Sequence, residues 1–459
     1  MARRPPVGRY HPAARTSFLS TEPASRQKVS EILRAALQGI NSHVTTKTSY
    51  NRSVVSSGPR FRTRGPMVHQ VIGAPVSGED FYNREEEQRV VWERLENNSL
   101  LMLAPRRVGK TSLMHRLRDT SHQNGFLATF LSVQDQSLEL GFVLKLYEAV
   151  GKLQKADTVL RRLADGPFGS FFGRIKKLGP VELAEAPRDE WRELGNALTL
   201  ALDTLAGSWL LLVDELPVFV LSLVRQDPTG TRARDFLHWF RTLRQGPYDR
   251  ARIRWFLAGS LGLDTVAARL DLSDTINDLQ LTPLGPFSPS TAHTFLVALG
   301  KTYHVDLSVE VRERILERIG WPIPYYLQLM FSELHSRQQE GAAAPTVATV
   351  DEAFEELLSP SKKMYFDYWR QRLGEELGRP DDGFANLLLT KSARDERGAS
   401  LRVLRQALGA QITDPDQRDQ KLRYLLDVLL SDGYLVEHEE RFVFRSPLLR
   451  AFWLRRAAR

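Results

Sequence analysis

The chain has no cysteine among its 459 residues, which excludes disulfide bonds, thiolate metal sites and a cysteine nucleophile. Its ten histidines show no metal-ligand spacing, because even the nearest pair, His115 and His122, is too far apart for the one-turn pairing of a helical zinc site. No apolar run approaches the roughly 20 residues that span a bilayer, and no signal-peptide segment follows Met1. The last two absences predict a cytoplasmic protein without a membrane partner, whereas the absence of cysteine does not indicate a compartment.

The most informative feature that is present is a phosphate-binding loop. Residues 100–112 read LLMLAPRRVGKTS, an apolar strand that runs into a loop and then a helix. Backbone N–H groups cradle phosphate oxygens when such a strand and helix hold the loop in a ring. Ala104 replaces the first glycine of the strict motif with another small side chain. The predicted ligands are ATP and Mg²⁺, and the predicted nucleotide-binding residues are Ala104, Pro105, Arg106, Arg107, Val108, Gly109, Lys110, Thr111 and Ser112.

Within this loop Lys110 is predicted to reach the β- and γ-phosphates and Thr111 to complete the Mg²⁺ shell. A second signal follows about a hundred residues later, where the apolar run at 209–213 ends in Asp214 and Glu215. Successive strand residues point to opposite sides, so Asp214 can hold Mg²⁺ while Glu215 polarises the attacking water. Taken alone, the run also fits an ordinary strand that ends in solvated carboxylates.

A third predicted strand, at 253–258, ends in Gly259 and Ser260. The Ser260 hydroxyl is predicted to sense the γ-phosphate or to orient the water. Strands often end in Gly-Ser turns, so the sensor role of Ser260 is supported only when the phosphate loop is considered with it.

These motifs resemble those of the AAA+-related STAND class of P-loop ATPases, in the prokaryotic group near the origin-recognition ATPases. The resemblance covers residues 67–459 and extends to FYNRE at 81–85 and GWPIPYYLQ at 320–328, which are similar to F-x-G-R-E-like and G-G-x-P-like elements. It implies that the backbone around Phe81 and the rigid turn at Pro324 form the adenine pocket. Asn83 and Trp321 stand where the family has glycine. The alternative for the second segment is a helix-breaking loop in a core.

Strands that alternate with helical periodicity, at 138–163 and 189–205, predict an α/β fold with a parallel, doubly wound sheet. The predicted domains are a P-loop ATPase core at 67–288, a helical lid at 289–378 and a winged helix at 379–459. In the last of these, three helices at 384–392, 400–408 and 417–430 precede a hairpin at 432–444 that turns at 437–440. Three glutamates in the wing would repel a phosphate backbone, so a protein partner is as well supported as DNA.

Basic residues are concentrated at the N-terminus. Residues 1–66 hold 12 of the 63 Lys and Arg but 2 of the 55 Asp and Glu, so residues 67–459 carry 51 basic and 53 acidic side chains. This leader is predicted to be mostly disordered and suited to nucleic acid or acidic partners. The alternative is that translation starts at Met67, because residues 68–78 resemble the usual start of the family.

The predicted function is an ATP-binding and ATP-hydrolysing switch that couples the nucleotide state to lid and winged-helix orientation. The alternative is a nucleotide-gated DNA- or protein-binding module with little or no turnover. A kinase would need an acceptor pocket, of which the sequence gives no sign. In a homo-oligomer, Arg241 or Arg244 could act as an arginine finger toward the neighbouring subunit, but a surface-facing charge pair three residues apart on one helix is favoured.

Overall fold

The computed structural model describes residues 67–153, 190–246, 248–259 and 263–457, within one compact unit that begins at Arg64. The leader at 1–66, the end of the helical pattern predicted for 138–163 and the predicted sensor Ser260 lie outside the described residues. Among the helices that are described, none combines the length and the hydropathy needed to cross a membrane.

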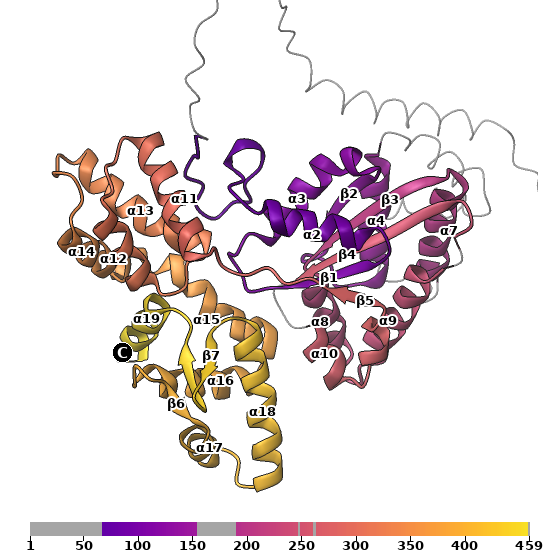
Figure 1. Ribbon diagram of the computed structural model, residues 1–459. Coiled ribbons are helices and arrows are strands. Elements are labelled where there is room, and N and C mark those ends of the chain that lie inside the picture. Colours follow the sequence, from indigo (N-terminus) through magenta and orange to yellow (C-terminus); the bar gives the residue numbers. More distant parts are fainter. Residues whose placement is uncertain (1–66, 154–189, 247, 260–262, 458–459) are drawn as a thin grey trace, which may run out of the picture. The chain divides into compact units, whose positions relative to one another are not determined.

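A five-stranded parallel sheet organises the first half of the described chain (Figure 1). Its strands lie in the order β2-β3-β4-β1-β5, so the phosphate-loop strand β1 is flanked by β4 and β5. The strands are β1 (Ser99–Leu103), β2 (Leu127–Ser132), β3 (Gly207–Asp214), β4 (Ala251–Gly259) and β5 (Leu279–Leu281). The helices of this part are α2 (Glu85–Leu95), α3 (Lys110–Thr120), α4 (Glu139–Gly151), α7 (Glu190–Thr204), α8 (Leu216–Gln226), α9 (Thr231–Arg244) and α10 (Leu263–Arg269).

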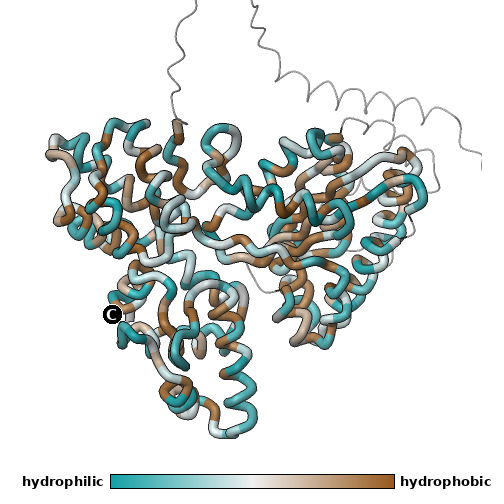
Figure 2. The backbone as a smooth tube through the Cα atoms, viewed as in Figure 1, coloured by the Kyte–Doolittle hydropathy of each residue, from teal (hydrophilic) through white to brown (hydrophobic). Residues whose placement is uncertain are grey.

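Each face of the sheet packs against its own set of helices, as the continuous apolar strands predict. Alternate residues of β3 belong to different hydrophobic cores: Leu210 and Leu212 join the α3 side, whereas Leu211 and Val213 join the side of α4, α7, α8 and α9. This division follows from the two-residue period of a strand. Figure 2 shows the central strands as strongly hydrophobic and the outer helices as largely hydrophilic.

Four helices follow the sheet in the region predicted to be the lid, and serine and threonine caps set where three of them begin. The Ser288, Ser308 and Thr346 side chains accept the backbone N–H groups of the third residue of their helices. Gly320 ends the second helix with a φ of 66°, and a Cβ there would lie 2.2 Å from Cδ of Pro447, so both conformation and space require glycine. The lid helices are α11 (Pro289–Tyr303), α12 (Val309–Ile319), α13 (Pro324–Gln339) and α14 (Val347–Leu357).

The C-terminal part has the three helices and the hairpin that the sequence predicts, in the predicted order. Helix α16 begins at Asp381, three residues before the predicted start, and the hairpin turns at Glu439 and Glu440, which both have positive φ. The hairpin pairs with β6 in a three-stranded antiparallel sheet of order β6-β8-β7. The elements are α15 (Met364–Leu377), α16 (Asp381–Ala393), β6 (Ala399–Ser400), α17 (Leu401–Gly409), α18 (Pro415–Ser431), β7 (Leu435–His438), β8 (Arg441–Phe444) and α19 (Pro447–Ala457).

Candidate nucleotide-binding site

The phosphate loop spans residues 104–109, between β1 and α3. Gly109 is the N-cap of α3 with a φ of 102°, a conformation that suits glycine and aims the first free N–H groups of the helix into the loop. Ala104 is buried, and its N–H donates to the carbonyl of Gly259 on β4 at 3.3 Å. Its side chain therefore lies at the exit of a central strand, where a methyl group fits in place of the usual glycine.

The Lys110 side chain folds back into the loop. Its ammonium donates to the carbonyl oxygens of Ala104 at 2.6 Å and Pro105 at 3.0 Å. Lys110 is buried, and burial lowers the pKa of its ammonium to about 8. The loop thus holds a desolvated cation beside the N-terminus of a helix, which is an arrangement that attracts anions.

Thr111 and Asp214 meet although 103 residues separate them in the chain. The Thr111 hydroxyl donates to Oδ2 of Asp214 at 2.7 Å. Asp214 is almost completely buried at the end of β3, and burial followed by the nearby Glu215 raises the pKa of its carboxyl to about 6. A hydroxyl and a carboxylate oxygen are the ligands that Mg²⁺ prefers, so the donor set fits this ion. The described residues contain no group of three or more His, Cys, Asp or Glu that would form a separate metal site.

Glu215 takes a different direction from Asp214. Its backbone is left-handed, with a φ of 59°, and it forms the N-cap of α8. Its side chain lines the same cleft as Lys110 and Thr111, whereas Asp214 does not line that cleft. The direction of Glu215 is therefore set by the left-handed turn after β3 and not by the predicted alternation along the strand, and separate tasks for the two acids stay a prediction.

A cleft of about 250 Å³ contains most of the predicted nucleotide-binding residues. Of the predicted residues 104–112, residues 106–112 line it, and Ala104 and Pro105 do not. Phe81 and Pro324, which the resemblance assigns to the adenine pocket, both line the cleft, and Pro324 is the first residue of the lid helix α13. Their roles toward a nucleotide stay predictions.

Arg84 is a residue of this cleft that sequence reasoning did not select. Its guanidinium donates to the carbonyl oxygens of Val108 at 3.3 Å and Gly285 at 2.8 Å and lies 4.7 Å from the ring centre of Phe287. Arg84 and the preceding Asn83 both have positive φ, at 84° and 56°. Asparagine adopts this conformation more readily than most residues, which explains how Asn83 replaces a family glycine. The signal for a special turn here was that Asn83 stands where the family element has glycine.

The lid also contacts the segment before η1 (Gly78–Asp80), on the far side of the cleft. Gln328 of α13 accepts the N–H of Val71 on its side-chain oxygen at 2.6 Å and the amide of Gln70 on its backbone oxygen at 2.9 Å. Both Val71 and Gln328 line the cleft. A bound ligand would therefore be enclosed by residues from three separate parts of the chain, because residue 71, the loop at 104–109 and residue 328 meet there.

The two arginines considered as arginine fingers make ion pairs within the chain. Arg244 is buried, donates to both carboxylate oxygens of Asp278 at 3.0 and 2.7 Å, and also donates to the carbonyl of Thr275. Arg241 pairs with Asp274 at 3.1 Å. Both thus anchor α9 to the segment before β5, and the predicted surface-facing charge pair is wrong for Arg244, because that residue is buried.

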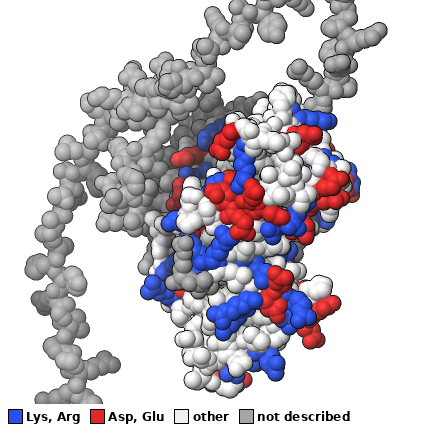
Figure 3. All heavy atoms as spheres, turned by 90° about the vertical axis from the view of Figure 1, so that its left-hand side faces the viewer, with Lys and Arg blue, Asp and Glu red and all other residues white. Residues whose placement is uncertain are grey.

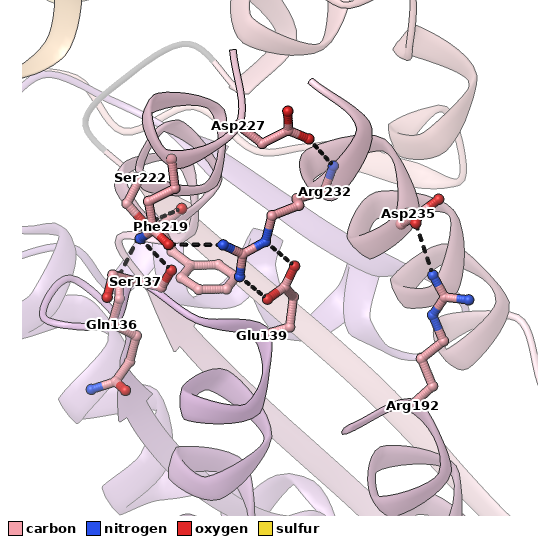
Figure 4. Close-up of polar contacts among 10 residues, drawn as sticks. Gln136, Ser137, Glu139, Arg192, Phe219, Ser222, Asp227, Arg232 and Asp235 are labelled. Atoms are coloured by element: carbon pink, nitrogen blue, oxygen red, sulfur yellow. Dashed lines mark hydrogen bonds and ion pairs between the residues drawn. The ribbon is translucent and has the colours of Figure 1, made fainter. Parts of the chain in front are cut away.

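The loop after β2 is held beside the cleft by a polar cluster around Arg232 (Figure 4). Arg232 donates through Nε to Glu139 at 2.9 Å, makes a second bond to the same carboxylate through Nη2, and donates to Gln226. Ser222 donates to the carbonyl of Gln136, and Gln226 donates to that of Ser137. Helix α8, which follows Glu215 directly, thereby holds the loop whose first residues reach the cleft.

We expect Arg232→Ala to lower the free energy of unfolding by about 1–3 kcal/mol, because it leaves the buried Glu139 carboxylate without its bidentate partner. Arg192→Ala is the matched control, since its partner Asp235, 3.1 Å away (Figure 4), has a side chain that is 52% exposed, against 10% for Glu139. Loss of that pair is expected to cost less than about 0.5 kcal/mol. Urea unfolding of both variants measures the difference, and equal losses would contradict the structural role assigned to Arg232.

These features together define a class of fold. A parallel sheet of order β2-β3-β4-β1-β5, a phosphate loop between β1 and α3, and carboxylates at the tip of β3 constitute the P-loop NTPase α/β fold. The helical region that follows the sheet was also predicted from the sequence.

Comparison with solved structures agrees with this assignment. The Walker-type ATPase PABY2304 of Pyrococcus abyssi is similar to this chain with a TM-score of 0.53 and 20% identity, over 82% of this chain and 96% of that one. The ORC2 protein of Aeropyrum pernix, solved as ADPNP–ADP complexes, has a TM-score of 0.46 and 13% identity, over 82% and 94%. Only the first similarity is high enough to establish a shared fold. It confirms the predicted α/β fold with a parallel sheet.

No family model matches the chain, and a search of the curated proteins found no match.

Proposed function

We propose that this protein binds ATP with Mg²⁺ and hydrolyses it as an AAA+/STAND-type molecular switch. The observation that supports this most directly is the hydrogen bond between Thr111 and Asp214, with Lys110 and Glu215 at the adjoining cleft. A hydroxyl on the phosphate loop and a strand-end carboxylate are the two protein ligands that a nucleotide-bound Mg²⁺ needs in a P-loop site.

Each residue has one task in the proposed mechanism. Lys110 and the first N–H groups of α3 bind the phosphate oxygens, and Thr111 and Asp214 hold the metal. Glu215 accepts a proton from the attacking water as a general base. Phe81 and Pro324 enclose the base. Bound Mg²⁺ supplies neutralisation of the charge that develops on the phosphates. Ser260 stays a predicted sensor outside the described residues.

The proposed coupling to the C-terminal part is supported by contacts next to the phosphate loop. A Cβ on Gly433, in the turn between α18 and β7, would lie 2.9 Å from Pro105 and 2.8 Å from Trp321 of the lid. The phosphate loop, the lid and the predicted winged helix are thus packed against one another at one point. A change in the loop on loss of the γ-phosphate would have to be accommodated there, because packed interfaces do not deform continuously.

The nucleotide-gated binding module is the alternative, and the charges of the C-terminal helices favour a protein partner for it. Arg405 of α17 pairs with Asp419 of α18 at 2.8 Å, and Lys421 of α18 pairs with Asp381 at 2.8 Å. These cations are already neutralised, which reduces the gain from binding a phosphate backbone. Figure 3 shows basic and acidic side chains side by side on the face that it presents.

The test is phosphate release by the full chain from ATP, measured with Mg²⁺ and with an excess of chelator. We expect turnover with Mg²⁺ and none with chelator, because the metal neutralises the phosphates and is held by only two protein ligands. Duplex DNA is added in a parallel series, and stimulation by DNA would assign DNA to the winged helix. Tight ATP binding without turnover under every condition would favour the gated binding module.

A further inference from the structure

Arg107 lies in the phosphate loop, and its side chain contacts three other segments of the chain. Its Nη1 donates to the carbonyl of Gly73, before the first core helix, at 2.9 Å. Its guanidinium carbon lies 4.7 Å from the ring centre of Tyr325 on α13 and 4.9 Å from that of Tyr368 on α15. These contacts are close enough for cation–π attraction to both rings.

The two tyrosine rings form a corner around the guanidinium. Their centres are 6.3 Å apart and their planes meet at 83°. The hydroxyl of Tyr325 also donates to the carbonyl of Tyr365 at 3.3 Å, which joins the start of the lid helix to α15. Burial raises the pKa of Tyr325 to about 12, so its hydroxyl stays protonated at neutral pH and can donate this hydrogen bond.

Helix α15 continues these contacts into the C-terminal part. Trp369, the residue after Tyr368, lies 4.8 Å from the ring of Tyr434, and the Tyr434 hydroxyl donates to the Trp369 carbonyl at 2.6 Å. Tyr434 follows Gly433 in the turn after α18. A contiguous set of packed aromatic residues therefore leads from Arg107 through Tyr368 and Trp369 to the predicted winged helix.

Arg107 also has a backbone conformation that fixes where its side chain begins. Its φ is 68°, in the left-handed region, which costs energy for a residue with a Cβ. The neighbouring Arg106 and Val108 line the cleft, so a rearrangement of the loop around phosphates would move the Arg107 backbone as well. The side chain would transmit that movement to both tyrosine rings.

We propose that Arg107 is a positioning residue that couples the phosphate loop to α13 and α15 by holding its guanidinium against Tyr325 and Tyr368. The proposal rests on the proposed nucleotide-binding function and adds the residue through which bound nucleotide is sensed by the lid and the C-terminal part. It gives the Arg107 side chain a task in addition to the nucleotide binding that the motif predicted for residues 104–112.

The first test is a double-mutant cycle on ATP and ADP affinity with Arg107→Gln and Tyr368→Leu. Tyr368 does not line the cleft, so its effect on affinity must pass through Arg107 or α15. We expect Tyr368→Leu to weaken binding about three- to thirtyfold, which is the range for one desolvated cation–π contact. The double variant is expected to bind no more weakly than Arg107→Gln alone, because both substitutions remove the same contact.

Two controls match these substitutions. Tyr368→Phe keeps the ring and is expected to retain wild-type affinity within about twofold. Arg318→Gln removes a guanidinium that lies 4.3 Å from the Phe354 ring inside the lid, and it is likewise expected to leave nucleotide affinity unchanged. An Arg107→Gln effect without any effect of Tyr368→Leu would overturn the proposal and identify Arg107 as a direct phosphate ligand. Fully additive losses would also overturn it.

A second measurement covers the case in which Tyr368→Leu does not fold. Amide hydrogen exchange of residues 364–377 is followed with and without nucleotide, at concentrations that saturate each protein. The wild type is expected to show protection that depends on nucleotide, and Arg107→Gln is expected to lose it while still binding. Nucleotide-dependent protection that persists in Arg107→Gln, or that is missing in the wild type, would overturn the proposal. Failure of the function itself would appear separately, as a wild-type chain that binds no nucleotide.

Discussion

Replacing Glu215 by glutamine is expected to lower the rate of Mg²⁺-dependent ATP hydrolysis by about 100- to 10,000-fold, the usual contribution of a general base. Glutamine has nearly the same shape as glutamate and cannot accept the proton of the attacking water. The affinity for ATP should stay within about threefold of the wild type, because binding depends on other residues. Single-turnover phosphate release and equilibrium binding, measured on the same preparation, separate the two quantities.

Asp135→Asn is the matched control for this substitution. Asp135 follows the end of the neighbouring strand β2, does not line the cleft, and pairs with Lys145 at 3.1 Å on the surface. Neutralising it is expected to leave turnover unchanged. If Glu215→Gln retained wild-type turnover, Glu215 could not be the base. A loss of ATP affinity equal to the loss of turnover would instead place Glu215 in binding.

Replacing Lys110 by alanine is expected to weaken ATP binding by about 100- to 1,000-fold, because it removes a charge-assisted contact to two phosphate groups. The substitution also removes an ammonium that lies buried inside the loop, where it is held by the carbonyl oxygens of Ala104 and Pro105. Titration with a fluorescent ATP analogue measures the affinity directly. Unchanged affinity would contradict the assignment of the loop as the phosphate site.

The Lys110 variant should remain folded, which makes the binding result interpretable. Burial lowers the pKa of Lys110 from its ordinary value of 10.5 to about 8 in the folded chain, so the fold favours the neutral amine. The associated stability is fully present above the unfolded pKa and is lost as the pH falls through the folded pKa. At neutral pH the charged amine therefore opposes folding, and Lys110→Ala should unfold at the wild-type temperature or above it. Lys145→Ala removes a lysine that pairs with Asp135 on the surface, and it is the control for the unfolding temperature of Lys110→Ala.

The local features of the site could be predicted because they depend on residues that are close in sequence. The phosphate loop needs a strand, small residues and the start of a helix, and all of these lie within 100–112. The apolar run before Asp214 indicated a strand buried on both faces, and the two hydrophobic cores of the sheet confirm it. The turn at Gly320 was visible as a Gly- and Pro-marked helix end for the same reason, whereas the Ser and Thr caps of the neighbouring helices were not predicted.

Contacts between distant segments could not be predicted in the same way. Nothing near Arg84 in the sequence indicates that its guanidinium bonds the carbonyls of Val108 and Gly285. The contacts of Arg107 have the same character, because Gly73, Tyr325 and Tyr368 lie far from it along the chain. The motif favours a phosphate ligand at this position, since it describes the loop alone and not the helices that pack against it.

The sequence by itself determined the strand-loop-helix that forms the phosphate site, the pair of acids at a strand end and the order of sheet, lid and C-terminal helices. Hydrophobic periodicity and turn chemistry act over a few residues, so the local sequence specifies these features. Only the tertiary structure decided which side chains meet: Thr111 with Asp214, Arg244 with Asp278, and Arg107 with two tyrosines. These contacts follow from strand order and helix packing. The contribution of each residue there depends on partners that the local sequence does not specify.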